Sequence, residues 1–193
     1  MKIVFASNNQ NKIKEIQKLI PNSIEILSLK DINCLDDIPE TATTIEGNAR
    51  LKANYVTEKY GYPCFADDSG LEVEVLNGEP CVFSARYAGE EKDDQKNIKK
   101  LLNVLSCELN RKANFKTVIA LNLEGEQYLF TGTVEGIITL EQKGSNGFGY
   151  DPIFIPDGHE ITFAEMTLED KSKISHRAKA VNQLIMFINQ SDI

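Results

Sequence analysis

Two adjacent carboxylates are the first candidates for chemistry in this chain. Asp67 and Asp68 follow a short apolar run, Cys64–Ala66, which predicts a buried strand, and they precede Ser69-Gly70. Like charges side by side repel each other, and a divalent cation relieves that repulsion. Asp, Ser and Gly are also common in tight turns, so a plain turn is an equally good interpretation. Glu40 is a further carboxylate that could supply a metal-binding oxygen or simply face solvent.

A phosphate could bind at the polar loop of residues 7–11. This loop lies between an apolar run, Ile3–Ala6, and a helical pattern that starts at Lys12. The backbone N–H groups of a strand-to-helix turn attract phosphate, and the Lys12 ammonium adds a positive charge. The loop lacks the glycines of a P-loop or a dinucleotide-binding fingerprint, and a polar loop that ends in Lys is commonly only a solvated connection.

A planar base could stack on the loop Gly144–Asp151, in which three glycines are interleaved with Phe148 and Tyr150. Glycine lets the backbone approach a ligand closely, and an aromatic ring offers a stacking face. A flexible hairpin loop is the alternative interpretation. Further along, His176 and Arg177 place donor groups side by side at the start of an amphipathic helix. No His–Cys or His–Ser pair is evident, which disfavours nucleophilic catalysis. Together these features are typical of a nucleotide hydrolase.

The elements that must position these residues alternate between strands and helices. Apolar runs and period-two alternation predict strands at 3–6, 64–66, 71–75, 115–123, 127–140 and 153–155. Helical spacing predicts helices at 13–20, 44–60 and 98–105, and a last helix that begins between Thr167 and Ser175. Thr43–Glu46 fits a capping box, and Gly61 fits a C-terminal cap. The alternation indicates the α/β class, and with no linker or repeat we expect a single domain over residues 1–193.

The composition indicates a globular chain that can bury a hydrophobic core, and it disfavours nucleic acid as a partner. Of its 193 residues, 41% are hydrophobic and 26% charged, and the net charge is −8. Gripping a nucleic-acid backbone needs clustered Lys and Arg, so nucleic acid is disfavoured as a partner. The four cysteines lack Cys-x-x-Cys spacing, and the N-terminal apolar run is too short for a signal peptide or a membrane span. We therefore expect free thiols, a cytoplasmic location and no membrane partner.

Six motifs of this chain occur in order over nearly its whole length, and together they are specific. They are Ala6–Lys12, Thr44–Ala49, Ala66–Val73, Ser84–Gly89, Gly147–Phe154 and Ser175–Arg177. With these motifs the chain closely resembles the inosine triphosphate pyrophosphatase family, the XTP/dITP diphosphatases. The resemblance implies a two-lobed α/β fold with a long mixed sheet flanked by helices, an active site in the cleft between the lobes, and a homodimer.

The resemblance also implies a reaction and a set of site residues. A deaminated purine nucleoside triphosphate (ITP, dITP or XTP) would be hydrolysed to its monophosphate and pyrophosphate with Mg²⁺, which removes aberrant nucleotides from the precursor pool. Glu40 and Asp68 would bind the metal, and Asp68 would also activate water. The substrate would be bound by Ser7, Asn8, Asn9, Gln10, Asn11, Lys12, Lys52, Ser69, Phe148, Gly149, Tyr150, Asp151, Lys171, His176 and Arg177.

One departure from the family pattern falls in the first loop. Family members commonly have glycine where this chain has Asn8 and Asn11. Asn is the side chain that best tolerates left-handed backbone conformations, so the loop could keep its shape. Two other functions stay open: a pyrophosphatase for other modified nucleoside triphosphates, and a nucleotide-binding sensor without catalysis. Binding alone does not need a water-activating base, so Asp67, Asp68 and Lys12 argue against the sensor.

Overall fold

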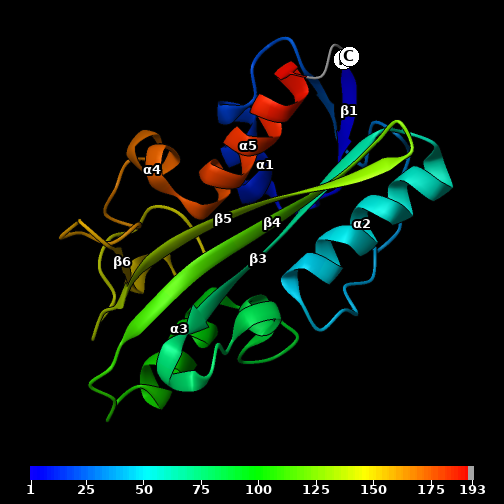
Figure 1. The fold of residues 1–193 in the computed structure, drawn as a ribbon. Coiled ribbons are helices and arrows are strands. Elements are labelled where there is room, and N and C mark those ends of the chain that lie inside the picture. The colour runs from blue at the N-terminus through cyan, green and yellow to red at the C-terminus, as the bar shows by residue number, and fades with distance from the viewer. Residues whose placement is uncertain (191–193) are drawn as a thin grey trace. The chain divides into compact units, whose positions relative to one another are not determined.

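The computed structural model describes residues 1–190, which form one six-stranded sheet and five α-helices within that range. The strand order is β2-β1-β3-β4-β5-β6 (Figure 1). The strands are β1 (Lys2–Phe5), β2 (Glu25–Leu27), β3 (Cys64–Val73), β4 (Lys112–Leu123), β5 (Glu126–Ile138) and β6 (Phe154–Pro156). The helices are α1 (Gln10–Leu19), α2 (Ile45–Tyr60), α3 (Asp94–Val104), α4 (Leu168–Ile174) and α5 (His176–Gln190).

The sheet is mixed, which confirms the predicted α/β class. β1 pairs in parallel with β2, where Ile3 lies opposite Ile26, and in parallel with β3, where Phe5 lies opposite Phe65. β5 pairs antiparallel with β6, where Ile137 lies opposite Ile155. The chain divides into two compact units. The first contains residues 1–68, 117–132 and 177 onward, and the second contains residues 69–116 and 133–176.

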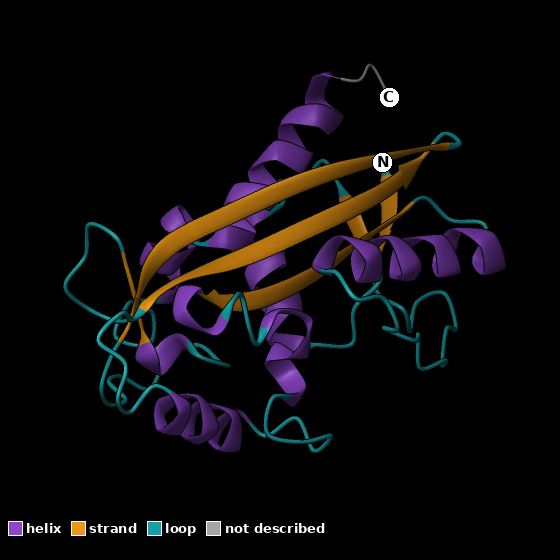
Figure 2. Cartoon of the chain, turned by 60° about the horizontal axis from the view of Figure 1, so that its bottom comes forward, coloured by secondary structure: helices purple, strands orange, loops and turns teal. Residues whose placement is uncertain are grey.

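In the first unit, helices cover both faces of the sheet (Figures 1 and 2). α1 and α5 lie on one face, and α2 lies on the other. The core on the α1/α5 face contains apolar side chains from the strands and from these two helices: Ile3, Phe5, Phe65, Ile119, Leu121, Ile16, Val181 and Leu184. α2 instead buries Ala49, Ala53 and Val56. Burial of these large and small apolar side chains fixes both helices to the strands that carry the candidate site.

The ends of α2 are set by local sequence signals. Thr44 is the N-cap, and its hydroxyl oxygen accepts a hydrogen bond from the Gly47 N–H at 3.0 Å. The helix therefore begins one residue later than a capping box starting at Thr43 would place it. Gly61 ends the helix with a φ of 74°, a left-handed conformation that favours glycine. These two caps place Asn48 and Lys52 one turn apart on the same helix face.

The second unit has its own core. α3 contributes Ile98 and Leu101, and Leu105 follows at its C-cap; they pack with Leu71, Val73, Phe115, Phe154 and Phe163 from strands and loops. The residues predicted to begin a single last helix form two helices instead, because Ser175 has extended backbone (ψ 154°) and ends α4. α5 then begins at His176.

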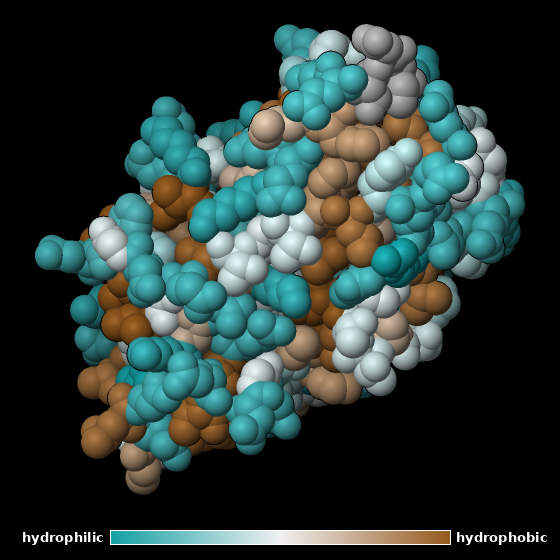
Figure 3. All heavy atoms as spheres, viewed as in Figure 1, coloured by the Kyte–Doolittle hydropathy of each residue, from teal (hydrophilic) through white to brown (hydrophobic). Residues whose placement is uncertain are grey.

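Two further features concern solvent and membrane. Hydrophilic residues cover most of the face shown in Figure 3, with apolar residues in patches among them. Within residues 1–190, no helix has both the length and the apolar character that crossing a membrane requires.

Candidate functional site

β3 is one continuous strand through the two aspartates, so the predicted turn at Asp67–Gly70 is wrong. Successive residues of a strand point to opposite faces, so Asp67 and Asp68 face opposite sides of the sheet. Both are buried. Asp67 pairs with Lys12 of α1 and Arg177 of α5, and Asp68 lies near Lys52 of α2. Two buried carboxylates are tolerated in the middle of a strand because those cations replace the solvation that a turn would have provided.

Asp67 lies among cations on one face of the sheet. The Lys12 Nζ atom is 3.1 Å from Asp67 Oδ2, and Arg177 Nε donates to the same oxygen at 3.2 Å. Burial alone would raise the pKa of Asp67, but the charges of Lys12, Arg177 and Lys52 outweigh it and hold that pKa below its ordinary value. Asp67 is 1% exposed, and these cations keep it ionised in spite of that burial.

Glu15 extends this network and was missed by sequence reasoning. Arg177 is 2% exposed, and its Nη1 atom donates to a Glu15 carboxylate oxygen. A signal for Glu15 was present, because positions 12, 15, 16 and 19 form one stripe of α1 that also contains the buried Ile16. A carboxylate on the inward stripe of a helix needs a cation, and Arg177 is that cation.

Asp68 and Glu40 share one lysine. Lys52 Nζ lies 2.5 Å from Glu40 Oε1 and 3.7 Å from Asp68 Oδ1. Asn48, one turn earlier in α2, donates from Nδ2 to Asp68 Oδ2 at 3.3 Å, and its Oδ1 accepts from the Ala42 N–H at 2.9 Å. Burial raises the pKa of Asp68, and the charges of Lys52 and Lys12 oppose that shift. Asn48 thus ties Asp68 to the chain segment next to Glu40.

The donor set at this point fits magnesium bound jointly with a substrate. Glu40 and Asp68 each approach the same ammonium within 4 Å, so their oxygens converge on one cation. Among residues 1–190, no group of three or more His, Cys, Asp or Glu side chains is arranged to hold a metal ion. Mg²⁺ in phosphate-processing sites typically uses one or two carboxylates together with substrate phosphates and water, which two carboxylates can serve.

The loop predicted to bind phosphate becomes the start of α1. The helix begins at Gln10, and its N-cap, Asn9, accepts from the Asn11 N–H at 3.0 Å and the Lys12 N–H at 3.2 Å. Ser7 Oγ accepts from the Asn9 N–H at 3.2 Å. Neither Asn8 nor Asn11 has a positive φ, so these positions need no glycine. Residues 8–11 are exposed, and the helix end behind them provides the partial positive charge that favours an anion.

The glycine-rich loop in the second unit is closed around Asp151. The Asp151 carboxylate is 2% exposed and accepts from Lys171 Nζ at 2.7 Å and from the Phe148 N–H at 2.9 Å. Tyr150 is also buried, and its hydroxyl donates to the Ser84 carbonyl at 2.8 Å. A side chain at Gly147 would place Cβ 2.0 Å from Asp151 Oδ2, so glycine is required there. Tyr150 and Asp151 therefore hold the loop, while the Phe148 ring remains half-buried.

Two further predicted residues of the second unit lie against aromatic rings. Lys171 Nζ is 5.0 Å from the centroid of the Phe148 ring, within cation–π range. The His176 ring is 4% exposed and stacks on Phe115, with ring centroids 4.7 Å apart. Phe115 gave no signal in the sequence beyond its place in a predicted strand, because stacking partners come together only in the fold.

The predicted site residues thus fall into two groups, one in each unit. The first unit brings together Lys12, Glu40, Lys52, Asp68 and Arg177, with residues 7–11 at the start of α1. The second brings together Phe148, Gly149, Tyr150, Asp151 and Lys171 in and against one loop, and it also contains His176 and the half-buried Ser69 of β3.

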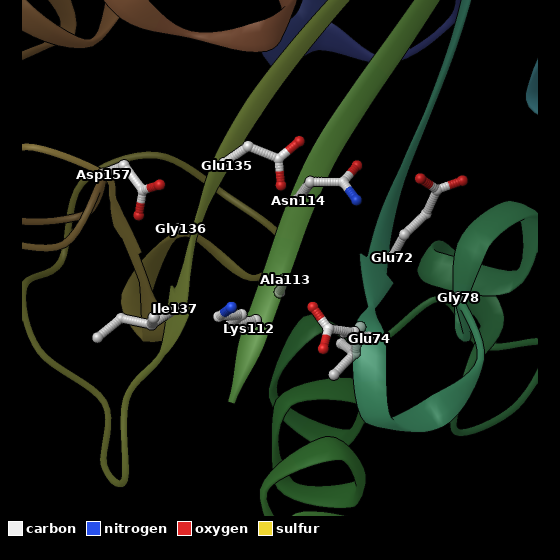
Figure 4. Close-up of a pocket in the computed structure, with 11 residues that line it drawn as sticks. Glu72, Glu74, Gly78, Lys112, Ala113, Asn114, Glu135, Gly136, Ile137 and Asp157 are labelled. Atoms are coloured by element: carbon white, nitrogen blue, oxygen red, sulfur yellow. The ribbon is translucent and has the colours of Figure 1, made fainter. Parts of the chain in front are cut away.

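A separate pocket of the second unit contains none of these residues (Figure 4). Its volume is about 610 Å³, and Glu135, Asn114 and Glu72 lie in a row across β5, β4 and β3. Glu74 and Asp157 also line it, with Lys112 as the single cation among the lining residues. Four carboxylates against one ammonium repel a polyanion, so the electrostatics disfavour this pocket as a triphosphate site.

Comparisons with known proteins give one consistent family. A family model described as the Ham1 family matches residues 3–187. A dITP/XTP pyrophosphatase of Flavobacterium johnsoniae is 66% identical over 185 residues, and the match covers 96% of both chains. A protein of the same name from Porphyromonas gingivalis is 53% identical over 188 residues, 97% of each chain.

Solved structures agree with the sequence comparisons. The structure of the Staphylococcus aureus Ham1 protein superposes with a TM-score of 0.92 at 42% identity, over the full length of both chains. A nucleoside-triphosphatase described as a dITP/XTP pyrophosphatase from Mycobacterium abscessus gives a TM-score of 0.79 at 41% identity, covering 96% of this chain and 99% of that one. The chain therefore belongs to the Ham1 family.

Proposed function

We propose that this protein is a nucleoside triphosphate pyrophosphatase that hydrolyses dITP, ITP and XTP to the monophosphate and pyrophosphate. The observation that carries the proposal is the convergence of Glu40 and Asp68 on the Lys52 ammonium, with Lys12 near enough for the charges of Lys52 and Asp68 to act on it. Two carboxylates and two lysines next to an exposed helix N-terminus suit a metal-bound triphosphate. The names of the relatives, dITP/XTP pyrophosphatases of similar length, support the reaction and the base.

In this proposal the residues of the first unit bind and cleave the triphosphate. Glu40 and Asp68 would hold Mg²⁺, which when bound neutralises charge on the phosphates. Lys12 and Lys52 would bind phosphate oxygens, and the partial positive charge at the start of α1 would attract a terminal phosphate. Asp68 would accept the proton of the water that attacks the α-phosphorus, so that pyrophosphate leaves. Asp67 stays ionised and orients Lys12, to which it is already paired.

The residues of the second unit would bind the nucleoside. The half-buried Phe148 ring offers a stacking face for a purine, and Lys171, held by Asp151, keeps that ring in place. We propose that His176 and Arg177 complete base recognition. Arg177 carries only donors, so it can satisfy the 6-oxo group of hypoxanthine or xanthine and leaves the 6-amino group of adenine facing a donor. Its contacts with Asp67 and Glu15 also support a second role, positioning Asp67.

We also propose that the protein acts as a homodimer on the cytoplasmic nucleotide pool and so removes deaminated nucleotides before polymerases use them. The dimer rests on the family resemblance, and the location rests on the free cysteines. A pyrophosphatase for other modified nucleotides and a silent sensor are the alternative functions.

A substrate panel tests the function directly. Pyrophosphate release is measured with ITP, dITP, XTP, ATP, GTP and dUTP in Mg²⁺, with Asp68→Asn as the inactive control. We expect kcat/KM for ITP, dITP and XTP to exceed that for ATP by about 10⁴-fold, because mismatched donors in a buried site remain unpaired. Preference for dUTP would support the first alternative, and nucleotide binding without release of pyrophosphate would support the sensor.

A further inference from the structure

Hydrogen bonds tie backbone N–H groups of the glycine-rich loop to partners outside it: Ser145 and Asn146 donate to the Ala164 carbonyl, and Gly149 donates to a side chain. Gly149 N–H donates to the Asp94 Oδ2 atom at 2.7 Å. Asp94 is the first residue of α3 and is exposed. The motifs of the sequence do not include it, and it is separated from Gly149 by 55 positions. This hydrogen bond ties the start of α3 to the residue that follows Phe148.

The rest of the loop turn is closed by the loop itself. Phe148 N–H donates to the Asp151 carboxylate at 2.9 Å, and Asp151 N–H donates to the Phe148 carbonyl at 3.2 Å. Gly149 has a φ of 60°, a left-handed conformation that favours glycine, and its N–H is bound by Asp94. The Asp94 carboxylate therefore holds the backbone of the turn at Gly149, next to the Phe148 N–H that Asp151 accepts.

A neighbouring aspartate has a different role. Asp93 is the N-cap of α3, and its side chain accepts from the Lys96 N–H at 3.0 Å. Asp93 therefore satisfies the helix end, and Asp94 is left to bond with the loop. The two residues carry the same side chain at adjacent positions, Asp93 half-buried and Asp94 exposed, so Asp93 serves as a control for Asp94.

We propose that Asp94 is a positioning residue for the Phe148 loop and thereby sets the affinity for the nucleoside half of the substrate. The proposal rests on the proposed function. A hydrogen bond to a carboxylate is stronger than one between neutral groups, and here it restricts a glycine, the most flexible residue type. Its loss lets Gly149 leave the left-handed conformation and moves the Phe148 ring away from the position in which Lys171 and Asp151 hold it.

The sign of the effect separates this role from simple electrostatics. Removing a negative charge near a binding site for a polyanion should, through charge alone, tighten binding. Loss of the hydrogen bond between Asp94 and Gly149 should instead weaken substrate binding. We expect Asp94→Ala to raise KM for ITP by about three- to tenfold, the effect of one charge-assisted hydrogen bond reduced for solvent exposure. Asp94→Asn keeps an acceptor oxygen and lacks the charge, so its weaker hydrogen bond should raise KM clearly less than Asp94→Ala does.

The experiment compares Asp94→Ala, Asp94→Asn and Asp93→Ala in the full chain. KM and kcat for ITP, the inhibition constant of pyrophosphate, the free energy of unfolding and amide hydrogen exchange across residues 147–151 are measured. We expect Asp94→Ala to raise KM and to speed exchange in this loop, with kcat and pyrophosphate inhibition unchanged. Asp93→Ala should lower the free energy of unfolding and leave KM at the wild-type value.

Three outcomes would overturn the proposal. The first is an unchanged or lowered KM for Asp94→Ala, the second is an equal rise in KM for Asp93→Ala, and the third is a rise in KM for Asp94→Asn that matches that for Asp94→Ala. Failure of the proposed function is distinguishable, because wild-type protein would then release no pyrophosphate from ITP. In that case, unchanged amide hydrogen exchange at residues 147–151 in Asp94→Ala would show that Asp94 does not restrain the loop.

Discussion

Asp67 and Asp68 are neighbours in sequence, yet the structure predicts a large loss of stability when Asp67 is changed to Asn and little change when Asp68 is. Asp67 neutralises two cations, the half-buried Lys12 and the buried Arg177. Breaking a buried ion pair by removing one partner costs about 3–5 kcal/mol, because the other charge is left without compensation. For a chain of this length that corresponds to a fall in Tm of roughly 6–20 °C. Asp67→Asn should therefore be strongly destabilised.

Asp68 has weaker compensation in the folded state. Lys52 is 3.7 Å away and is already paired with Glu40, and burial raises the Asp68 pKa, so folding disfavours its ionised form. An asparagine removes that unfavourable charge and can still accept the hydrogen bond from Asn48. We expect Asp68→Asn to change the free energy of unfolding by no more than about 1 kcal/mol. Its turnover should fall by about 10²–10⁴-fold through loss of the base alone.

The dependence on pH has a definite sign for each residue. The pKa of Asp67 is lower in the folded state, so its contribution to stability is complete above the unfolded pKa of about 3.9 and is lost as the pH falls through the folded value. The difference between wild type and Asp67→Asn should therefore be largest at neutral pH and shrink below about pH 4. For Asp68, whose pKa is raised, the penalty is present at neutral pH and disappears in acid.

Urea unfolding followed by circular dichroism, in buffer without divalent metal, measures these free energies at pH 7 and pH 4, and release of pyrophosphate measures turnover. Equal destabilisation by the two substitutions would refute the assignment of the cations to Asp67. Turnover near the wild-type rate in Asp68→Asn would refute its role as the base.

Three further predictions concern the metal, the base and the assembly. EDTA should abolish release of pyrophosphate and added Mg²⁺ should restore it, because Glu40 and Asp68 would otherwise face the triphosphate with uncompensated charge. Full turnover without metal would refute this mechanism. Arg177→Ala should slow ITP hydrolysis and narrow the preference for ITP over ATP, since it removes the donors that match a 6-oxo group; if both substrates slow by the same factor, Arg177 only positions Asp67. Light scattering at micromolar concentration should give the mass of a dimer, and a monomer mass would remove that prediction.

Local signals in the sequence predicted most elements correctly. Alternation of apolar runs with helical spacing gives the α/β class, because strand and helix periods are properties of neighbouring residues. Thr44 and Gly61 limit α2 through hydrogen bonds and backbone angles that involve only a few positions. The turn at Glu124-Gly125 has positive φ at both residues and joins β4 to β5 as expected. The N-cap of α2 lies one residue later than the capping box predicted, and Ser175 divides the single predicted last helix into α4 and α5. Both differences arise where competing local signals lie next to each other.

The sequence also determined which residues are candidates for chemistry, since carboxylates, lysines, glycines and aromatic rings are visible as residue types. It could not determine their partners. Asp67-Asp68 reads as a turn until Lys12, 55 positions earlier, and Arg177, 110 positions later, are known to neutralise Asp67. Those contacts allow β3 to continue, bury Arg177 against Glu15 and leave Asp68 with a shared lysine. Only tertiary structure decides such pairings, because the charge that makes a buried carboxylate tolerable comes from parts of the chain that folding alone brings within 4 Å.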